Sequence, residues 1–409
     1  SGAWNAHEEK FFSNLTSVLS HFTLKASYSL TADRGPADVT NSQAIITSYS
    51  PYRPFTSIQE SGLYIKELEN SELTYEKKHE LNIGADMGFL NNRINLAVDW
   101  YKRNNYDLIG IVNTQGAGGQ ILKYANIASM KSHGIEFTLS TKNIKTKDFN
   151  WNTDFIFSNA KNEVTDLKQN ANVMELISGN GFAKQGYPVR GLFSIPFVGL
   201  DKDGIPVIIN EKGEATSTDI NFQERQNTGF LKYEGPTDPT ITGSLGNMFS
   251  YKGFRLNLFI TYSFGNVIRL NPVFKAYYSD LTAMTREFKN RWTLPGDEAK
   301  TNVPAILSKR MYDSNEDLKY AYNAYNYSTE RIAKGDFIRL KEISLAYDFP
   351  KAWINPLKLT DLSLKVQATN LFLIYADDKL NGQDPEFFNA GGVASPVPRQ
   401  FTITLRLGL

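Results

Sequence analysis

The sequence predicts an all-β fold, an antiparallel up-and-down β-barrel that spans a membrane. Three observations predict it. About ten segments alternate apolar and polar residues, as barrel strands do. The connections between these segments are short and long in turn along the whole chain. The segments are also 9–15 residues long, and about 9–11 residues are enough to cross a bilayer when a strand is tilted.

The last segment, 398–409, shows the alternation most clearly. Successive side chains of a strand point to opposite faces. One face would carry only apolar side chains: Phe401, Ile403, Leu405, Leu407 and Leu409. The other would carry Thr402, Thr404, Arg406 and Gly408. In a membrane barrel the apolar face touches lipid and the polar face borders an enclosed aqueous interior, whereas in a soluble sheet the apolar face would cover a core.

Nine further segments follow the same pattern and are expected to be strands. They are 22–31, 79–90, 93–101, 132–141, 149–158, 239–251, 254–264, 337–349 and 359–373. Asn91-Asn92 and Lys252-Gly253 have the turn chemistry of tight hairpins. The other short connections lie near 145–147 and 350–356.

The long connections are expected at about 32–78, 103–131, 159–238, 265–336 and 375–397. Structureless connections of this length are unusual in a compact soluble domain. They are typical of the extracellular loops of a membrane barrel, whose turns on the opposite side are short. The rival fold is a large soluble all-β protein, a sandwich or a propeller, which would not be expected to distribute its loops so unevenly.

Composition excludes several classes of protein. The 409 residues carry a net charge of +1, so no bulk charge favours nucleic acid, and we expect no nucleic-acid partner. There is no cysteine, which excludes a disulfide framework and thiolate metal sites. The mean hydropathy is −0.36 and no long apolar run occurs, so no transmembrane helix is expected.

No motif in the chain carries catalysis or a cofactor. The 4 histidines are scattered, and Gly116-Ala117-Gly118-Gly119 is not followed by the Lys-Ser/Thr of a phosphate loop. Asp201-Lys202-Asp203-Gly204 resembles the start of a calcium loop but lacks the rest of the twelve-residue pattern. We therefore expect no catalytic residue, no cofactor and no metal ligand, and the protein is not expected to be an enzyme.

Aromatic residues gather in the long connection 265–336. The set comprises Tyr277, Tyr278, Trp292, Tyr320, Tyr322, Tyr325 and Tyr327. Such rings, interleaved with Asn and Asp, can stack on sugars or hold peptides, and they can equally pack within the loops or on a partner protein. These seven residues are the candidate ligand or partner contacts. In the same connection, apolar residues recur at three- and four-residue steps from 274 to 292, which predicts a helix.

Several runs of sequence resemble the SusC/RagA-type TonB-dependent transporters of the Bacteroidetes outer membrane. Residues 334–347, Lys-Gly-Asp-Phe-Ile-Arg-Leu-Lys-Glu-Ile-Ser-Leu-Ala-Tyr, are similar to a "GDFLRLKNITLGY" strand of that family. Residues 367–372 are similar to its "GQNLF" strand end, and 132–136 to its "KGIE" strand start. Further matches are 238–243 followed by 249–254, Asp384-Pro385-Glu386, and Arg399-Gln400-Phe401. Together these runs sample the chain from about residue 75 onward.

The resemblance implies that this chain supplies about ten C-terminal strands of a barrel that has twenty-two in the family. No counterpart of the family's plug, TonB-contacting segment or signal peptide is expected here. An incomplete circuit of strands would leave open edges in lipid, so the N-terminal part of the same transporter is an expected partner, bringing the plug and the remaining strands.

The function implied by the resemblance is active, TonB-dependent import across the outer membrane. The substrate would be an oligosaccharide or an oligopeptide, and a SusD-like surface lipoprotein would cover the extracellular loops. The expected location is the bacterial outer membrane, in contact with its lipid. Two rivals remain open: a passive porin or specific channel, and a soluble glycan-binding β-protein.

Overall fold

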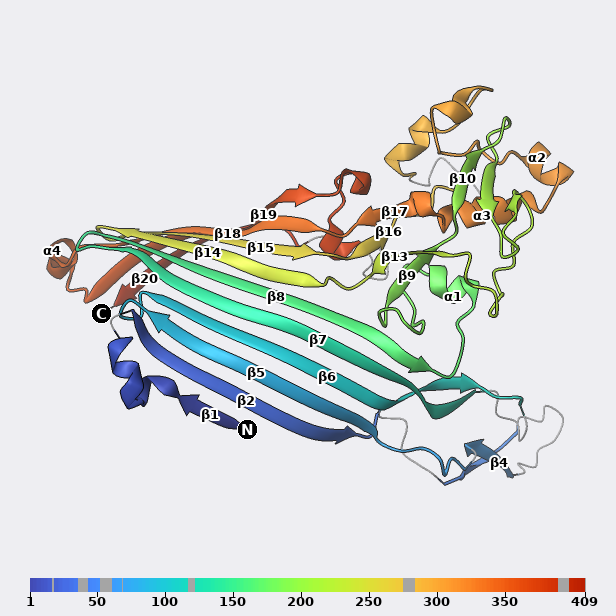
Figure 1. Ribbon diagram of the computed structural model, residues 1–409. Helices are drawn as coiled ribbons and strands as arrows, with labels where there is room; N and C mark the ends of the chain where they lie inside the picture. Colours follow the sequence, from blue (N-terminus) through green and yellow to red (C-terminus); the bar gives the residue numbers. More distant parts are fainter. Residues whose placement is uncertain are drawn as a thin grey trace.

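The protein is built on a single antiparallel sheet of eleven strands. The computed structural model describes residues 1–16, 18–35, 43–51, 61–67, 69–116, 122–274, 284–388 and 397–408. Figure 1 shows the sheet as a curved wall, with strand order β1-β2-β5-β6-β7-β8-β14-β15-β18-β19-β20. Each strand pairs with the next one of the sheet along the chain, as in an up-and-down barrel. Within the described residues no ladder joins β1 to β20, so the sheet has two edges.

All ten predicted strands are present. The strands of the sheet are β1 (Gly2–Asn5), β2 (Leu19–Asp33), β5 (Glu76–Phe89), β6 (Ile94–Asn113), β7 (Leu122–Lys145), β8 (Phe149–Leu167), β14 (Ile241–Tyr251), β15 (Phe254–Phe264), β18 (Phe337–Asp348), β19 (Asp361–Ala376) and β20 (Gln400–Gly408). The eleventh, β1, has only four residues, which are too few to show a period of two.

Strands β6, β7 and β8 are much longer than predicted. The connection expected at 103–131 shrinks to 114–121, since β6 and β7 continue as a ribbon beyond their neighbours. The prediction ended β6 too early because the pairing of β6 with β7 shifts register between Asn105 and Leu108, where Asp107 takes a positive φ of 57°. A bulge shifts the inside–outside alternation, so the period of two stops at that point in the sequence although the strand does not.

The register separates an apolar face from a polar face across the whole sheet. Leu24, Ala85, Val98, Phe137 and Phe157 stand opposite one another in turn from β2 to β8. We call the side that carries this row the apolar face. The next row, Lys25, Gly84, Asp99, Glu136 and Ser158, belongs to the polar face. A one-residue slip would exchange the two faces, so the alternation fixes the register.

Charges on the polar face are paired across strands. Lys25 Nζ lies 2.9 Å from the Asp86 carboxylate, and Arg255 lies 2.8 Å from Asp348. These pairs join positions that were predicted to face the aqueous interior of the barrel. Each is exposed and contributes up to about 1 kcal/mol. Their role is therefore to make this face polar rather than to hold the sheet together.

The short turns lie at one end of the sheet and the long connections at the other (Figure 1). The β5–β6 turn holds Leu90, Asn91 and Asn92 at φ of 52°, 56° and 57°. Lys252 and Gly253 have φ of 43° and 89°, as a two-residue hairpin turn with the twist of its strands requires. A third short connection contains α4 (Lys351–Ile354) and a 3₁₀ turn, η7 (Asn355–Leu357).

The long connections carry structure of their own. Residues 168–240 contain α1 (Val173–Ile177), β9 (Gly191–Ser194), β10 (Phe197–Leu200), β11 (Pro206–Ile209), β12 (Ala215–Thr216) and β13 (Lys232–Pro236). Residues 265–336 contain β16 (Val267–Arg269), η4 (Arg286–Asn290), η5 (Asp297–Ala299), α2 (Lys309–Ser314), α3 (Leu318–Asn326), η6 (Thr329–Arg331) and β17 (Ile332–Lys334). We call the described parts of these two connections the loop module.

The remaining elements are shorter. Two 3₁₀ turns, η1 (Ala6–Glu8) and η2 (Lys10–Asn14), follow β1, and a hairpin of β3 (Ile45–Tyr49) and β4 (Gly62–Glu67) stands between β2 and β5. The connection after β19 contains η8 (Asp378–Leu380) and η9 (Pro385–Phe387). None of the helices in the described part of the chain is long and apolar enough to cross a membrane.

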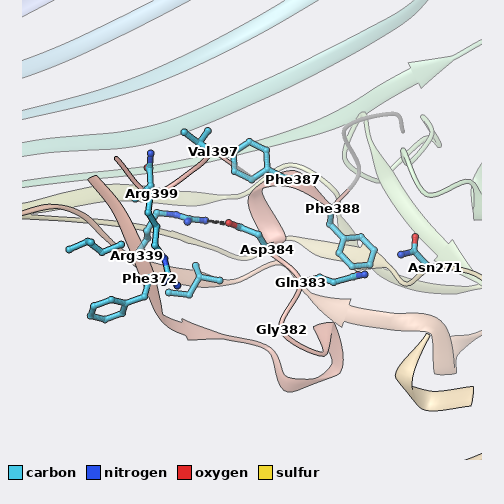
Figure 2. Close-up of a pocket in the computed structure, with 13 residues that line it drawn as sticks. Asn271, Arg339, Phe372, Gly382, Gln383, Asp384, Phe387, Phe388, Val397 and Arg399 are labelled. Atoms are coloured by element: carbon cyan, nitrogen blue, oxygen red, sulfur yellow. Dashed lines mark hydrogen bonds and ion pairs between the residues drawn. The ribbon is translucent and has the colours of Figure 1, made fainter. Parts of the chain in front are cut away.

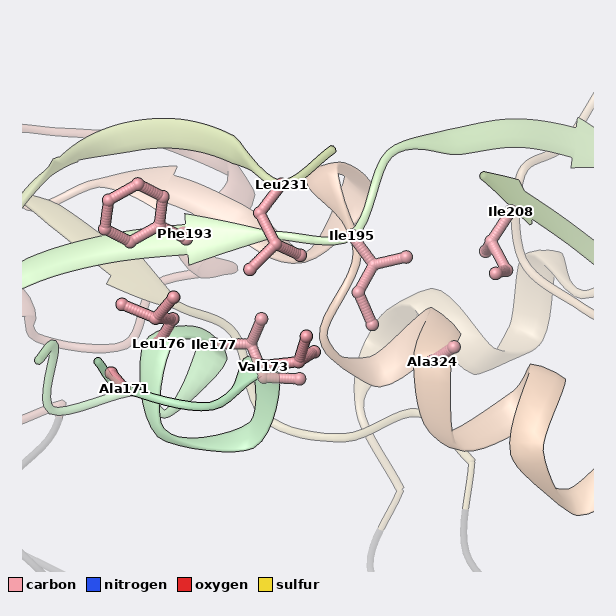
Figure 3. Close-up of a cluster of buried hydrophobic side chains, with 9 residues drawn as sticks. All are labelled: Ala171, Val173, Leu176, Ile177, Phe193, Ile195, Ile208, Leu231 and Ala324. Atoms are coloured by element: carbon pink, nitrogen blue, oxygen red, sulfur yellow. The ribbon is translucent and has the colours of Figure 1, made fainter. Parts of the chain in front are cut away.

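The loop module has a hydrophobic core. Figure 3 shows its buried side chains: Ala171, Val173, Leu176, Ile177, Phe193, Ile195, Ile208, Leu231 and Ala324. Ala324 comes from the second connection and the others from the first, so the two connections fold as one body. The prediction of a helix at 274–292 is wrong for the described residues 284–292, which contain only the 3₁₀ turn η4. Residues 275–283 are outside the described ranges.

One glycine of the sheet occupies a position where no side chain fits. A Cβ added to Gly243 of β14 would collide with the Ile156 carbonyl oxygen and the Tyr262 hydroxyl. Tyr262 lies opposite Gly243 and its hydroxyl donates to the Ile156 carbonyl oxygen at 2.9 Å. The ring thus crosses the glycine to reach β8. On the same strand, a Cβ on Gly246 would meet nothing closer than 3.6 Å.

We therefore expect Gly243→Ala to destabilise the folded sheet, whereas Gly246→Ala leaves it unchanged. Forcing a methyl group against a backbone oxygen costs about 1–3 kcal/mol. The measurement is the temperature at which the full-length protein, in detergent, loses its compact migration on a gel. Equal transition temperatures for the two variants would contradict this account of the β8–β14–β15 contact.

Candidate functional site

The candidate site lies on the polar face, where β18 and β19 approach the long connections. Both strands are irregular there. The pairing shifts between Leu340 and Glu342, and Asn370 of β19 has a positive φ of 54°. Asparagine tolerates this conformation better than most residues. Bulges of this kind re-aim side chains and are frequent beside functional sites.

The central contact of the site is a buried ion pair between Arg339 and Asp384. Arg339 donates to the two carboxylate oxygens of Asp384 at 2.5 and 2.6 Å. The two side chains are only 6% and 10% exposed. Glu386 lies 3.3 Å from the same guanidinium. The pair fastens the connection that follows β19 onto the polar face of β18.

Asp384 has a second role in this connection. Its side chain accepts from the Glu386 backbone N–H at 3.1 Å and so caps the 3₁₀ turn η9. Asp377 similarly caps η8 and accepts from the Lys334 backbone N–H at 2.8 Å. Leu380, between them, is buried against Ile268, Leu270 and Ala333 of the loop module. The connection is therefore held both to the wall and to the loop module.

A cavity of about 520 Å³ opens beside the ion pair (Figure 2). Its polar lining includes Asn271, Asn370, Gln383 and Arg399 together with the paired Arg339 and Asp384, and its apolar lining includes Phe387, Phe388 and Val397. This volume lies in the range of small-molecule sites, which combine apolar surface with a few polar groups. In the described part of the chain no carboxylate lies within ion-pair distance of Arg399, which lines the cavity.

Two buried arginines organise the loop module, which contributes Asn271 to the lining of this cavity. Arg269 donates to the carbonyl oxygens of Phe193 and Ser328 at 2.5 and 3.0 Å, and to Ser194 Oγ at 3.1 Å. Its guanidinium also lies over the Tyr327 ring. Burial lowers the pKa of Arg269 to about 9, which still leaves it charged at neutral pH. Arg331 bonds the Glu287 carboxylate and the Asn271 carbonyl oxygen.

The five predicted aromatic contacts that the structure describes are dispersed through the loop module, and none of the five lines the cavity. Tyr277 and Tyr278 lie outside the described residues. Tyr322 and Tyr325 of α3 are each 1% exposed, so their rings pack within the module. Burial raises the pKa of the Tyr325 phenol.

The other three predicted aromatics are more accessible. Tyr320 is 40% exposed. Trp292 is half-buried, donates to Glu298 at 2.9 Å and packs over Gly204. Tyr327 is half-buried beside Arg269. Of the described members of the set, Tyr320 is the one most accessible to a ligand or a partner.

Sequence reasoning used Arg339 and Asp384 only as parts of family-like motifs and did not assign them to a site. An arginine on an otherwise alternating strand is the signal that could have singled out Arg339. Nothing in the sequence places Asp384 beside it. For calcium, the Asp201 carboxylate accepts from the backbone N–H groups of Asp203 and Ile205, so it closes its own turn. The described residues contain no group of three potential metal ligands.

We expect Asp384→Asn to loosen the connection that follows β19. Breaking a buried ion pair from one side costs about 3–5 kcal/mol, because the remaining charge stays buried without its partner. The measurement is limited proteolysis of the full-length protein, with cleavage within 377–399 as the readout. Asp378→Asn removes an equal charge at an exposed neighbour and should leave cleavage unchanged. Equal cleavage rates in the two variants would remove the structural role given to Arg339 and Asp384.

Comparison with known proteins gives several relatives, although no family model matches the sequence. TonB-dependent receptor P3 of Formosa agariphila is 25% identical over 404 residues, which cover 94% of this chain and 37% of the relative. TonB-dependent receptor SusC of Bacteroides thetaiotaomicron is 26% identical over 433 residues, covering 99% of this chain and 39% of SusC. The chain thus spans about two fifths of the length of these relatives.

Solved structures give the same fold. A structure of the RagAB peptide transporter superposes with a TM-score of 0.75 at 24% identity, covering 99% of this chain and 42% of that one. The same importer in its open-open state gives 0.76 at 23% identity. The eleven-stranded sheet therefore matches part of the RagA barrel, and both kinds of comparison agree with the motifs of the sequence. Over almost its whole length the chain resembles part of the barrel of SusC/RagA-type TonB-dependent receptors, a family of outer-membrane transporters.

Proposed function

We propose that the receptor containing this chain imports oligosaccharides or oligopeptides across the outer membrane, as the SusC-like half of a SusCD-type complex. The observation that carries this proposal is the architecture of the sheet. Its apolar face suits lipid, its polar face suits an enclosed aqueous path, and a folded loop module stands at one end of that path. The long connections then face the outside of the cell and the short turns face the periplasm.

The outer edges of β1 and β20 have no partner strand within the described residues. In hydrocarbon every backbone N–H and C=O must be paired, so an open edge is not tolerated. We infer that the N-terminal part of the same transporter pairs with β1 and β20, completes a barrel of twenty-two strands and supplies the plug. The paired charges of the polar face, Lys25 with Asp86 and Arg255 with Asp348, then line the interior or contact the plug.

The partners follow from the same proposal. The relatives are named TonB-dependent receptors, which supports TonB as the energy donor, acting through the N-terminal region. The solved RagAB structures are of a peptide transporter, which supports an oligopeptide as one substrate class and a SusD-like lipoprotein as the lid over the loop module. The cavity beside Arg339, with its aromatic and amide lining, suits either an oligosaccharide or a peptide.

The direct test is uptake in a strain that expresses the full-length receptor and its lipoprotein partner, with and without TonB. Labelled oligosaccharide and oligopeptide pools are supplied separately. We expect uptake of one pool, and its loss when TonB is deleted, because the barrel interior is closed by a plug at rest. Uptake that continues without TonB would identify a passive channel instead. A receptor that is folded and monodisperse without detergent would be a soluble glycan-binding protein.

Among the aromatic candidates, Tyr320 and Tyr322 offer a matched pair. We propose that the exposed Tyr320 contacts the substrate or the lid, so Tyr320→Ala should weaken binding of the imported pool while leaving the melting temperature unchanged. Removing one contact of this kind costs about 1–2 kcal/mol, or roughly tenfold in affinity. Tyr322→Ala should lower the melting temperature, because it opens a cavity in the loop module. A Tyr320 variant that binds substrate and lid normally would remove this residue from the site.

A further inference from the structure

A row of basic side chains crosses the apolar face of the sheet. Lys102 of β6 lies opposite His133 of β7, and His133 lies opposite Lys161 of β8. These positions share the parity of Trp100 and Ile135, so they point to the same side as the apolar band. Three adjacent strands thus present a basic residue where the pattern calls for an apolar one.

The row has no internal counter-charge. Lys102, His133 and Lys161 are all exposed, and no acidic side chain of the described residues lies within ion-pair distance of either lysine. Neighbouring lysines differ in this respect, because Lys131 lies 3.0 Å from Glu163 and Lys77 lies 2.8 Å from Asp107. The two lysines of the row are therefore free to bind an external anion.

The row sits at the upper border of the apolar band, on the side of the long connections. Two residues closer to the short turns, the same three strands carry Trp100, Ile135 and Asn159. Next to the row, Tyr28, His79 and Tyr106 form an aromatic group, with ring centroids 6.5 and 5.3 Å apart in succession. Tyrosine and tryptophan collect where a bilayer's hydrocarbon meets its headgroups.

We propose that Lys102, His133 and Lys161 bind the phosphate groups of anionic lipids in the outer leaflet. Neighbouring strands are about 4.8 Å apart, so the two lysines flank the histidine at a spacing of roughly 10 Å. This spacing suits one phosphate held between them or two phosphates of one headgroup. Lysine stems lie along apolar surface while their ammonium groups reach the headgroups. The inference rests on the proposed contact of the apolar face with lipid.

Lipid counting by native mass spectrometry tests the site. The full-length receptor with its partner is purified in detergent and titrated with phosphatidylglycerol or with zwitterionic phosphatidylcholine. The test variant is Lys102→Gln with Lys161→Gln. The matched control is Lys202→Gln with Lys289→Gln, which removes the same charge from exposed positions of the loop module. Inorganic phosphate is added in a separate arm, to distinguish a lipid headgroup from a free phosphate.

We expect the receptor and the control to retain phosphatidylglycerol in preference to phosphatidylcholine. The test variant should bind phosphatidylglycerol roughly fivefold more weakly for each lysine removed. Inorganic phosphate at low millimolar concentration should not displace the lipid. Equal retention by test and control variants would overturn the proposal, as would displacement by phosphate. So would a test variant that loses self-association while its lipid count is unchanged, since the row would then be an interface between receptors.

Failure of the lipid site and failure of the membrane orientation give different results. If neither lipid binds any variant and the protein needs no detergent, the membrane orientation itself is wrong. If all variants insert into detergent and bind both lipids alike, the orientation stands and the phosphate site does not.

Discussion

Backbone hydrogen bonding in a medium without water is the constraint on which this structure depends. A strand in hydrocarbon has to pair both of its edges, and every strand of the sheet from β2 to β19 is paired on both sides by antiparallel ladders. Once the backbone is paired, the alternation of side chains along each strand gives the sheet one apolar face and one polar face. Each strand turns apolar residues to one side and polar residues to the other, which is the division that the proposed membrane orientation requires. The unpaired edges of β1 and β20 are the reason that further strands form part of the proposal.

The loop module shows a different use of polar groups. From its place in one long connection, Arg269 donates to the Phe193 carbonyl oxygen of the other connection and to the Ser328 carbonyl oxygen of its own. Arg331 joins Glu287 to Asn271. Arg339 extends the same principle to the barrel wall by holding Asp384. Guanidinium groups serve well here because one side chain has five donors in a fixed plane. Loops of this length stay folded because buried charges and a small apolar core act together.

The sheet could be predicted from the sequence because barrel strands carry their orientation in a local pattern. Phe137 beside Glu136, or Val366 beside Lys365, is readable without any knowledge of a partner strand. Prediction failed where the pattern is interrupted, as at the bulge near Asp107, which obscured the outer halves of β6 and β7. Strand β1 is too short to show such a pattern by itself.

The candidate site was beyond such reasoning, because its residues meet only through long-range folding. Arg339 and Asp384 are 45 residues apart, and Arg269 and Phe193 are 76 apart. The aromatic set in 265–336 was visible as a cluster in sequence. Its division into buried Tyr322 and Tyr325 and exposed Tyr320 depends on how α3 packs, which composition does not encode. The basic row on the apolar face needed the register of three strands, since each of its residues alone resembles an ordinary surface position.

The central claim is that the apolar face meets hydrocarbon and the polar face meets water. Because this chain has no cysteine, Val366→Cys and Lys365→Cys can be spin-labelled singly in a full-length receptor that is otherwise free of cysteine. In a bilayer, the label at 366 should be relaxed by oxygen, which concentrates in hydrocarbon, and not by a water-soluble nickel chelate. The label at 365 should show the reverse. Equal exposure of both labels to the nickel chelate would contradict the account.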